Sequence, residues 1–141
     1  MATTELVRPL IVVGVDGSAE SAKATAWAAA QAHATGGTLE LTIAWSRPVS
    51  YGLPLVVAGL DPEAQATEVV KAVAAGLDLP AERVRISVIH GAAPTILVAQ
   101  SAEADLLVVG PRGHGGFADL LLGSVSAYCV HHAACPVVVV R

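Results

Sequence analysis

Short runs of aliphatic, β-branched residues alternate along this chain with longer segments of good helix formers. Residues 10–15 form a short apolar run that ends in a turn sequence, which is typical of a strand. Residues 19–34 are rich in alanine and predict a helix, and residues 38–45 return to the strand pattern. Strands that alternate with helices in this way predict a parallel sheet with helices on both faces.

The same alternation continues to the end of the chain. Asp61 and Pro62 predict a helix start, because Asp accepts from an unpaired N–H and Pro fits the first turn. That helix should run to about Gly76. The later predicted elements are a strand over 83–89, a helix from Pro94 to about Glu103, a strand over 106–109, a helix from Gly123 or Ser124, and a strand over 137–140.

We therefore expect one α/β domain over residues 1–141, an open, mainly parallel five-stranded sheet in a Rossmann-like three-layer sandwich. Residues 46–60 carry turn formers and no helical period, which indicates a surface loop. Its apolar residues, Leu53 among them, could cap a ligand, meet a partner or fold back on the core.

Composition and charge narrow the function. Only 14% of residues are charged and 54% are hydrophobic, as expected for a sheet buried on both faces. A net charge of −4 without a Lys/Arg cluster argues against nucleic acid. No apolar run approaches the roughly 20 residues that span a bilayer, and residues 1–9 lack a secretion signal. Two cysteines are too few for a disulfide framework. We expect a cytoplasmic protein with no membrane segment.

Two predicted strands end in sequences suited to binding phosphate. Residues 14–18 follow the first strand, and residues 110–116 follow the fourth and lead to residues 123–126. In open parallel sheets the ligand crevice lies at the carboxyl ends of strands, where the strand order reverses. Glycine lets the backbone approach a triphosphate through its missing side chain and its φ freedom. Ser124 and Ser126 would add hydroxyls at a helix N-terminus.

The glycines of this second segment have a specific spacing. They follow the pattern Gly, two residues, Gly, nine residues, Gly, Ser over residues 110–124. This pattern resembles the nucleotide-binding motif of the universal stress protein family. Residues 11–18, 121–126 and 135–137 are also similar to that family, so the resemblance spans nearly the whole chain.

The resemblance implies a site for ATP, with or without Mg²⁺. Asp16 would lie by the nucleoside, Ala44 would offer its backbone to the adenine, and the phosphates would meet the glycine motif and the following helix. It also implies a homodimer through residues 137–140. The candidate binding residues are Gly14, Val15, Asp16, Ala44, Val109, Gly110, Arg112, Gly113, Gly115, Gly116, Gly123, Ser124, Val125 and Ser126.

Individual positions leave alternatives open. Pro111 stands where many relatives carry Ser and removes one N–H from the loop. Trp45 stands where relatives often carry His near the adenine, so we expect it to alter the base pocket. Arg112 is either a phosphate clamp or an exposed loop arginine. Asp16 is favoured as a ribose or metal-coordinating carboxylate over a turn former, and His114 is expected to be solvated.

The histidines and cysteines near the C-terminus do not predict a metal site. Cys129, His131, His132 and Cys135 fit no established zinc spacing. Cys129 is therefore expected to fill the core.

The leading functional hypothesis is a noncatalytic ATP-binding regulator or sensor. Asp119 is the only carboxylate side chain between Gly110 and Arg141, so no catalytic base is evident there, although slow hydrolysis is left open. One alternative is a weak ATPase or nucleotidyl transferase in which Asp16 places Mg²⁺. Another is an interaction module that binds no nucleotide, in which the glycines only permit tight turns.

Overall fold

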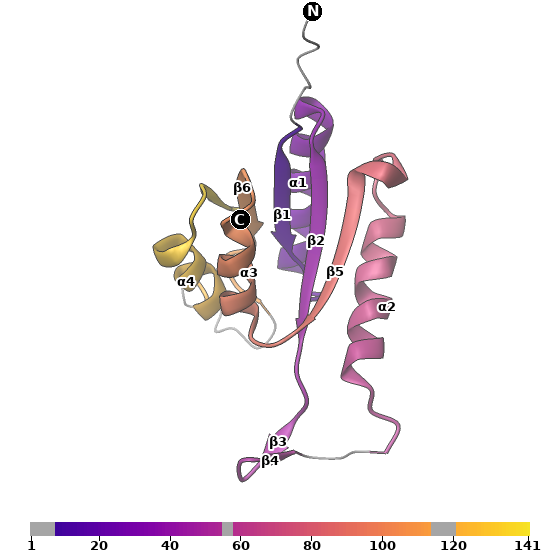
Figure 1. Cartoon of the computed structure of the whole chain (residues 1–141), viewed down its shortest axis with the longest axis vertical. Coiled ribbons are helices and arrows are strands. Elements are labelled where there is room, and N and C mark those ends of the chain that lie inside the picture. Colours follow the sequence, from indigo (N-terminus) through magenta and orange to yellow (C-terminus); the bar gives the residue numbers. More distant parts are fainter. Residues whose placement is uncertain (1–7, 55–57, 114–120) are drawn as a thin grey trace, which may run out of the picture.

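A five-stranded parallel sheet forms the centre of the protein, in the strand order β5-β2-β1-β6-β7 (Figure 1). The computed structural model describes residues 8–54, 58–113 and 121–141. The elements are β1 (Leu10–Gly14), α1 (Ala19–Thr35), β2 (Thr38–Trp45), β3 (Val49–Ser50), β4 (Leu53–Pro54), α2 (Pro62–Ala75), a 3-10 helix (Ala81–Arg83), β5 (Val84–His90), α3 (Ala93–Ser101), β6 (Leu106–Val109), α4 (Ser124–His132) and β7 (Val137–Val139). The predicted fold class is confirmed.

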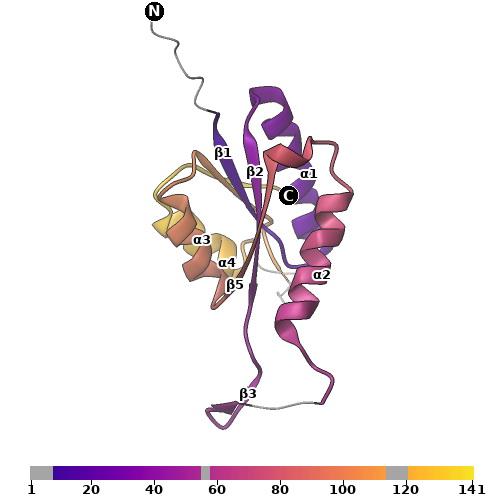
Figure 2. The same cartoon turned by 45° about the vertical axis from the view of Figure 1, so that its right-hand side comes forward.

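The helices cover the sheet as two outer layers. Figure 2 shows α1 and α2 on one face of the sheet and α3 and α4 on the other. Successive residues of β1 point to opposite faces, so Ile11 and Val13 pack with α1 and α2, whereas Val12 packs with α3 and α4. All three side chains are at most 2% exposed. This double burial accounts for the nearly continuous apolar strands.

Local signals in the sequence begin and end the helices. The Ser18 hydroxyl accepts the Ser21 N–H at 3.1 Å at the start of α1, and Gly36 ends that helix with φ of 70°. The Asp61 carboxylate accepts the Ala64 N–H at 3.1 Å at the start of α2. Within the described ranges, no helix combines the length and the apolar character that crossing a membrane requires.

The segment predicted as a loop contains a short antiparallel hairpin. Val49–Ser50 pairs with Leu53–Pro54 through a turn at Tyr51 and Gly52, which have φ of 52° and 76°. The hairpin projects away from the body of the protein (Figure 1). The Leu53 side chain is 69% exposed, so it does not fold back on the core.

Candidate functional site

The strand order creates a crevice beside β1. α1 connects β1 to β2 on one face of the sheet, whereas α4 connects β6 to β7 on the other face. The segments that follow β1 and β6 therefore diverge toward opposite faces, and this is where open α/β sheets bind ligands. A cavity of about 480 Å³ lies there, within the size range of small-molecule sites.

Every predicted site residue that the structure describes lines this cavity. These residues are Gly14, Val15, Asp16, Ala44, Val109, Gly110, Arg112, Gly113, Gly123, Ser124, Val125 and Ser126. Gly115 and Gly116, like His114, lie outside the described residues. Whether the lining residues bind a ligand stays a prediction.

Asp16 holds the turn after β1 while it lines the cavity. Its Oδ1 accepts the Ser18 N–H at 2.8 Å, and its own N–H donates to Ser21 Oγ at 3.3 Å. Ser21 Oγ in turn donates to the Ser18 carbonyl at 3.1 Å. The two interpretations of Asp16 are therefore compatible, because a carboxylate that shapes the turn also faces the cavity.

The loop after β6 approaches the loop after β1 very closely. A Cβ placed on Gly113 would lie only 2.5 Å from Asp16 Oδ2. A Cβ on Gly110 would lie 3.1 Å from the Glu20 backbone. Neither of these glycines has φ in the left-handed region, and Gly123 has φ of −81°. The expectation of φ freedom was wrong for Gly110, Gly113 and Gly123, which depend on the absence of a side chain, whereas Gly17 in the loop after β1 has φ of 82°.

The N-terminus of α4 is fastened to the same loop. The Gly123 N–H donates to the Pro111 carbonyl at 2.5 Å, and Ser126 Oγ donates to that carbonyl at 2.7 Å. Ser126 is 2% exposed, so its hydroxyl proton holds the loop and is not offered to the cavity, contrary to expectation. The N–H groups of Ser124 and Val125 have no acceptor within the helix, because they belong to its first turn.

The wall formed by β2 and α3 is largely apolar. Ala93, Ile96 and Leu97 of α3 line it, together with Thr42, whose Oγ1 donates to Gln100 Oε1 at 2.7 Å. We did not predict these four residues or Ser21 as site residues. Thr42 could have been found, because it shares the face of β2 with Ala44 two residues on. The α3 residues carry no such signal, since their position depends on helix packing.

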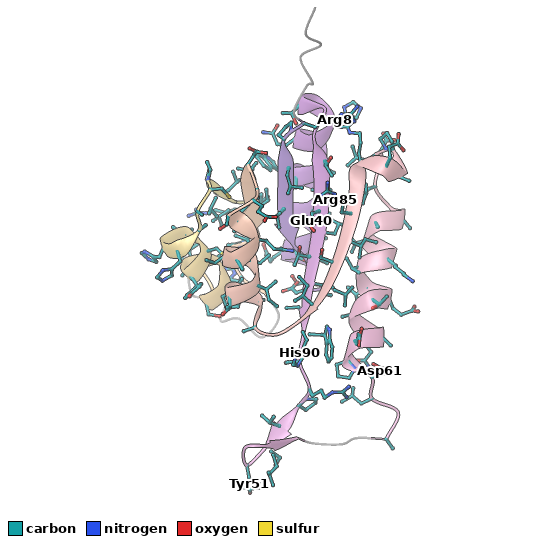
Figure 3. The ribbon with its side chains drawn as sticks, in the orientation of Figure 1. Arg8, Glu40, Tyr51, Asp61, Arg85 and His90 are labelled. Atoms are coloured by element: carbon teal, nitrogen blue, oxygen red, sulfur yellow. The ribbon has the colours of Figure 1, made fainter. Side chains whose placement is uncertain are left out.

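Trp45 does not reach the cavity, so the expectation that it alters the base pocket was wrong. It packs with the core on the face of α1 and α2, with its ring centroid 4.6 Å from that of His90. Figure 3 shows His90 at the carboxyl end of β5. Ala44 faces the cavity, and neighbouring residues of a strand point to opposite faces.

Arg112 belongs to the cavity wall and is not merely an exposed loop residue. Its Nη2 lies 3.7 Å from Oε1 of Glu20, in the first turn of α1. Arg112 thus both lines the cavity and forms an ion pair.

Cys129, His131 and His132 belong to α4, and Cys135 precedes β7. Across the described ranges, no group of three or more His, Cys, Asp or Glu side chains is placed to hold a metal ion. Cys129 is fully buried on the face of α3 and α4, which confirms it as a core residue. Burial, followed by the nearby Cys135, raises the pKa of the Cys129 thiol to about 11.

Comparison with known proteins points to one family. The sequence model of the universal stress protein family matches residues 9–141. Universal stress protein Rv2005c of Mycobacterium tuberculosis is 39% identical over 139 residues, which cover 93% of this chain and 45% of that protein. The chain thus spans less than half the length of this relative. A universal stress protein of Thermus aquaticus is 35% identical over 133 residues, covering 93% and 97% of the two chains.

Solved structures agree with this result. Universal stress protein UspA from Lactobacillus plantarum superposes with a TM-score of 0.74 at 24% identity, over 96% of this chain and 100% of that chain. A universal stress protein in complex with cAMP superposes with a TM-score of 0.61 at 30% identity, over 94% and 96% of the two chains. The first likeness concerns the fold, and the second protein also holds an adenine nucleotide.

Proposed function

The chain belongs to the universal stress protein family, and on that premise we propose that its cavity binds an adenine nucleotide, ATP in particular. The observation that carries the proposal is the junction of the two loops with the N-terminus of α4. There, close-packed glycines line one cavity together with Ser124 and Val125, whose N–H groups have no acceptor within α4. Backbone donors at a helix N-terminus suit a polyanion.

Each part of the cavity suits a different part of the nucleotide. The amides of Gly113, Ser124 and Val125 would hold phosphate oxygens. Asp16 would accept hydrogen bonds from the ribose, and the backbone of Ala44 would meet the base. The apolar side chains of α3 would pack against the base, as apolar walls do in small-molecule sites. Support also comes from the relative in complex with cAMP, which is 30% identical to this chain.

We favour a noncatalytic regulator or sensor over an enzyme. Among the described lining residues, Asp16 is the carboxylate, and we assign it to the ribose. A general base must be within reach of the proton that it removes, and a carboxylate bound to the ribose would not face a water that attacks the terminal phosphate. In an ATPase or nucleotidyl transferase, Asp16 would instead help to place Mg²⁺. Turnover that requires Mg²⁺ and is lost in Asp16→Ala would support that alternative.

We further propose that the protein is a cytoplasmic homodimer that pairs through β7. This strand lies at one edge of the sheet. The Pro136 carbonyl and the Val140 N–H both bond to β6. By the alternation of a strand, the polar backbone groups of Val137 and Val139 then face the open edge. An edge strand with open backbone groups is a template for pairing with another strand, and a second copy would supply that strand.

Small molecules that copurify with the protein test the nucleotide proposal. The purified protein is denatured by heat, and the released molecules are identified by mass spectrometry. We expect an adenine nucleotide, or, if the protein is isolated empty, a rise in melting temperature when ATP is added. The proposal would be refuted if the purified protein carries no nucleotide and its melting temperature does not change when ATP is added.

A further inference from the structure

Glu20 lies directly behind the loop that carries the glycine motif. A Cβ on Gly110 would lie 3.1 Å from the backbone C and O of Glu20, so the loop packs on the first turn of α1. Two residues further on, Nη2 of Arg112 lies 3.7 Å from Oε1 of Glu20. Of these two side chains, Arg112 lines the cavity and Glu20 does not. The guanidinium therefore has a carboxylate and the proposed phosphate site within its reach.

The pair is loose enough to be exchanged. A charge-assisted hydrogen bond between nitrogen and oxygen is about 2.7–2.9 Å long, whereas this separation is 3.7 Å. The two side chains are 31% and 29% exposed, so water screens their attraction. A terminal phosphate carries more charge than a carboxylate, and its oxygens match the planar fork of a guanidinium. Phosphate is therefore the stronger partner for Arg112.

We propose that Glu20 is a resting counter-charge for Arg112, which the guanidinium exchanges for the terminal phosphates of a bound nucleotide. The inference rests on the nucleotide-binding function proposed above. Glu20 then lowers affinity in two ways, because it competes for Arg112 and repels the incoming anion. Both effects grow with the number of phosphates, so Glu20 makes the cavity less selective for ATP over AMP than Arg112 alone would.

The test is a double-mutant cycle with nucleotides of different length. ATP, ADP and AMP are titrated calorimetrically into the wild type, Glu20→Gln, Arg112→Gln and the double variant. We expect Glu20→Gln to lower the dissociation constant for ATP about two- to fivefold, the range that a partly exposed ion pair allows. The dissociation constant for AMP should fall by less. In the Arg112→Gln background the Glu20 substitution should have a much smaller effect on ATP.

Glu63→Gln is the matched control. Glu63 is exposed in the first turn of α2, so this variant removes the same charge at an equivalent helix position away from the cavity. We expect its nucleotide affinities to equal those of the wild type.

Four results would overturn the inference. ATP affinity could be unchanged or weaker in Glu20→Gln, which would make Glu20 neutral or a support for the bound position of Arg112. The gain could persist in full without Arg112, or appear equally in Glu63→Gln, and either result would indicate general charge repulsion. Wild-type protein that bound none of the nucleotides would instead refute the proposed function, and the inference with it.

Discussion

Replacement of Gly113 by alanine should separate nucleotide binding from folding. The new Cβ would lie 2.5 Å from Asp16 Oδ2, whereas ordinary contact begins at 3.4 Å, so the groups must part by about 0.9 Å. The Asp16 carboxylate is held by its 2.8 Å bond to the Ser18 N–H, so the exposed loop retreats instead and the Gly113 amide leaves the proposed phosphate site. That movement removes about one hydrogen bond to a charged group from the complex, worth roughly 1.5–3 kcal/mol.

That loss corresponds to ATP affinity about 10- to 100-fold weaker, measured by calorimetry. Gly113 is exposed, so the loop can retreat, and we expect the free energy of unfolding to change by less than about 1 kcal/mol. Gly76→Ala is the control, because Gly76 also has an ordinary φ, of −87°, and its Cβ would meet nothing closer than 3.7 Å. ATP affinity in Gly113→Ala within twofold of the Gly76→Ala value would show that the reasoning is wrong.

Three further substitutions test other parts of the structure. Ser126→Ala removes the buried hydroxyl that donates to the Pro111 carbonyl, which still accepts the Gly123 N–H. Urea titration should therefore show a free energy of unfolding that is lower by about 1 kcal/mol. The Cys129 thiol keeps its proton to a pH of about 11 against 9.0 when unperturbed, so stability should fall as pH rises through this interval. Cys129→Ala should lack that part of the fall in denaturation curves, and an identical profile would contradict the assignment. Val139→Pro removes an N–H from the open edge of β7, and light scattering should show monomers where the wild type forms dimers. A dimeric variant would exclude pairing through that edge.

The sequence predicted the elements whose signals are local. The strand over 38–45 and the strand over 106–109 are found as predicted, and the caps at Ser18, Gly36 and Asp61 explain why the helix boundaries were close. Boundaries that depend on pairing differ slightly. The last strand ends one residue early, at Val139.

The hairpin formed by β3 and β4 was missed for a physical reason. Each of its strands has two residues, too few to show an alternating pattern, and its turn uses a positive φ at Tyr51, a residue type that seldom adopts one. Turn formers such as Gly52 indicated that the chain reverses, but not that the residues on either side of the turn pair as strands.

The residues of the site also differ in whether the sequence alone could identify them. The motif glycines are recognisable along the chain, and those that the structure describes, Gly110, Gly113 and Gly123, line one cavity. Ile96 and Leu97 could not be predicted as site residues, because the sequence of an apolar helix does not indicate which face lines a cavity. Trp45 was misplaced because a position next to Ala44 in sequence points to the other side of the sheet.

An NMR titration of the nucleotide-free protein with ATP tests the central claim most directly. Backbone amide resonances of Gly14, Gly113, Ser124 and Val125 should shift in a saturable manner, while those of the hairpin around Ser50 should stay unchanged. Amide shifts that are absent, that never saturate, or that gather on the hairpin instead of the cavity would contradict the assignment of this cavity as a nucleotide site.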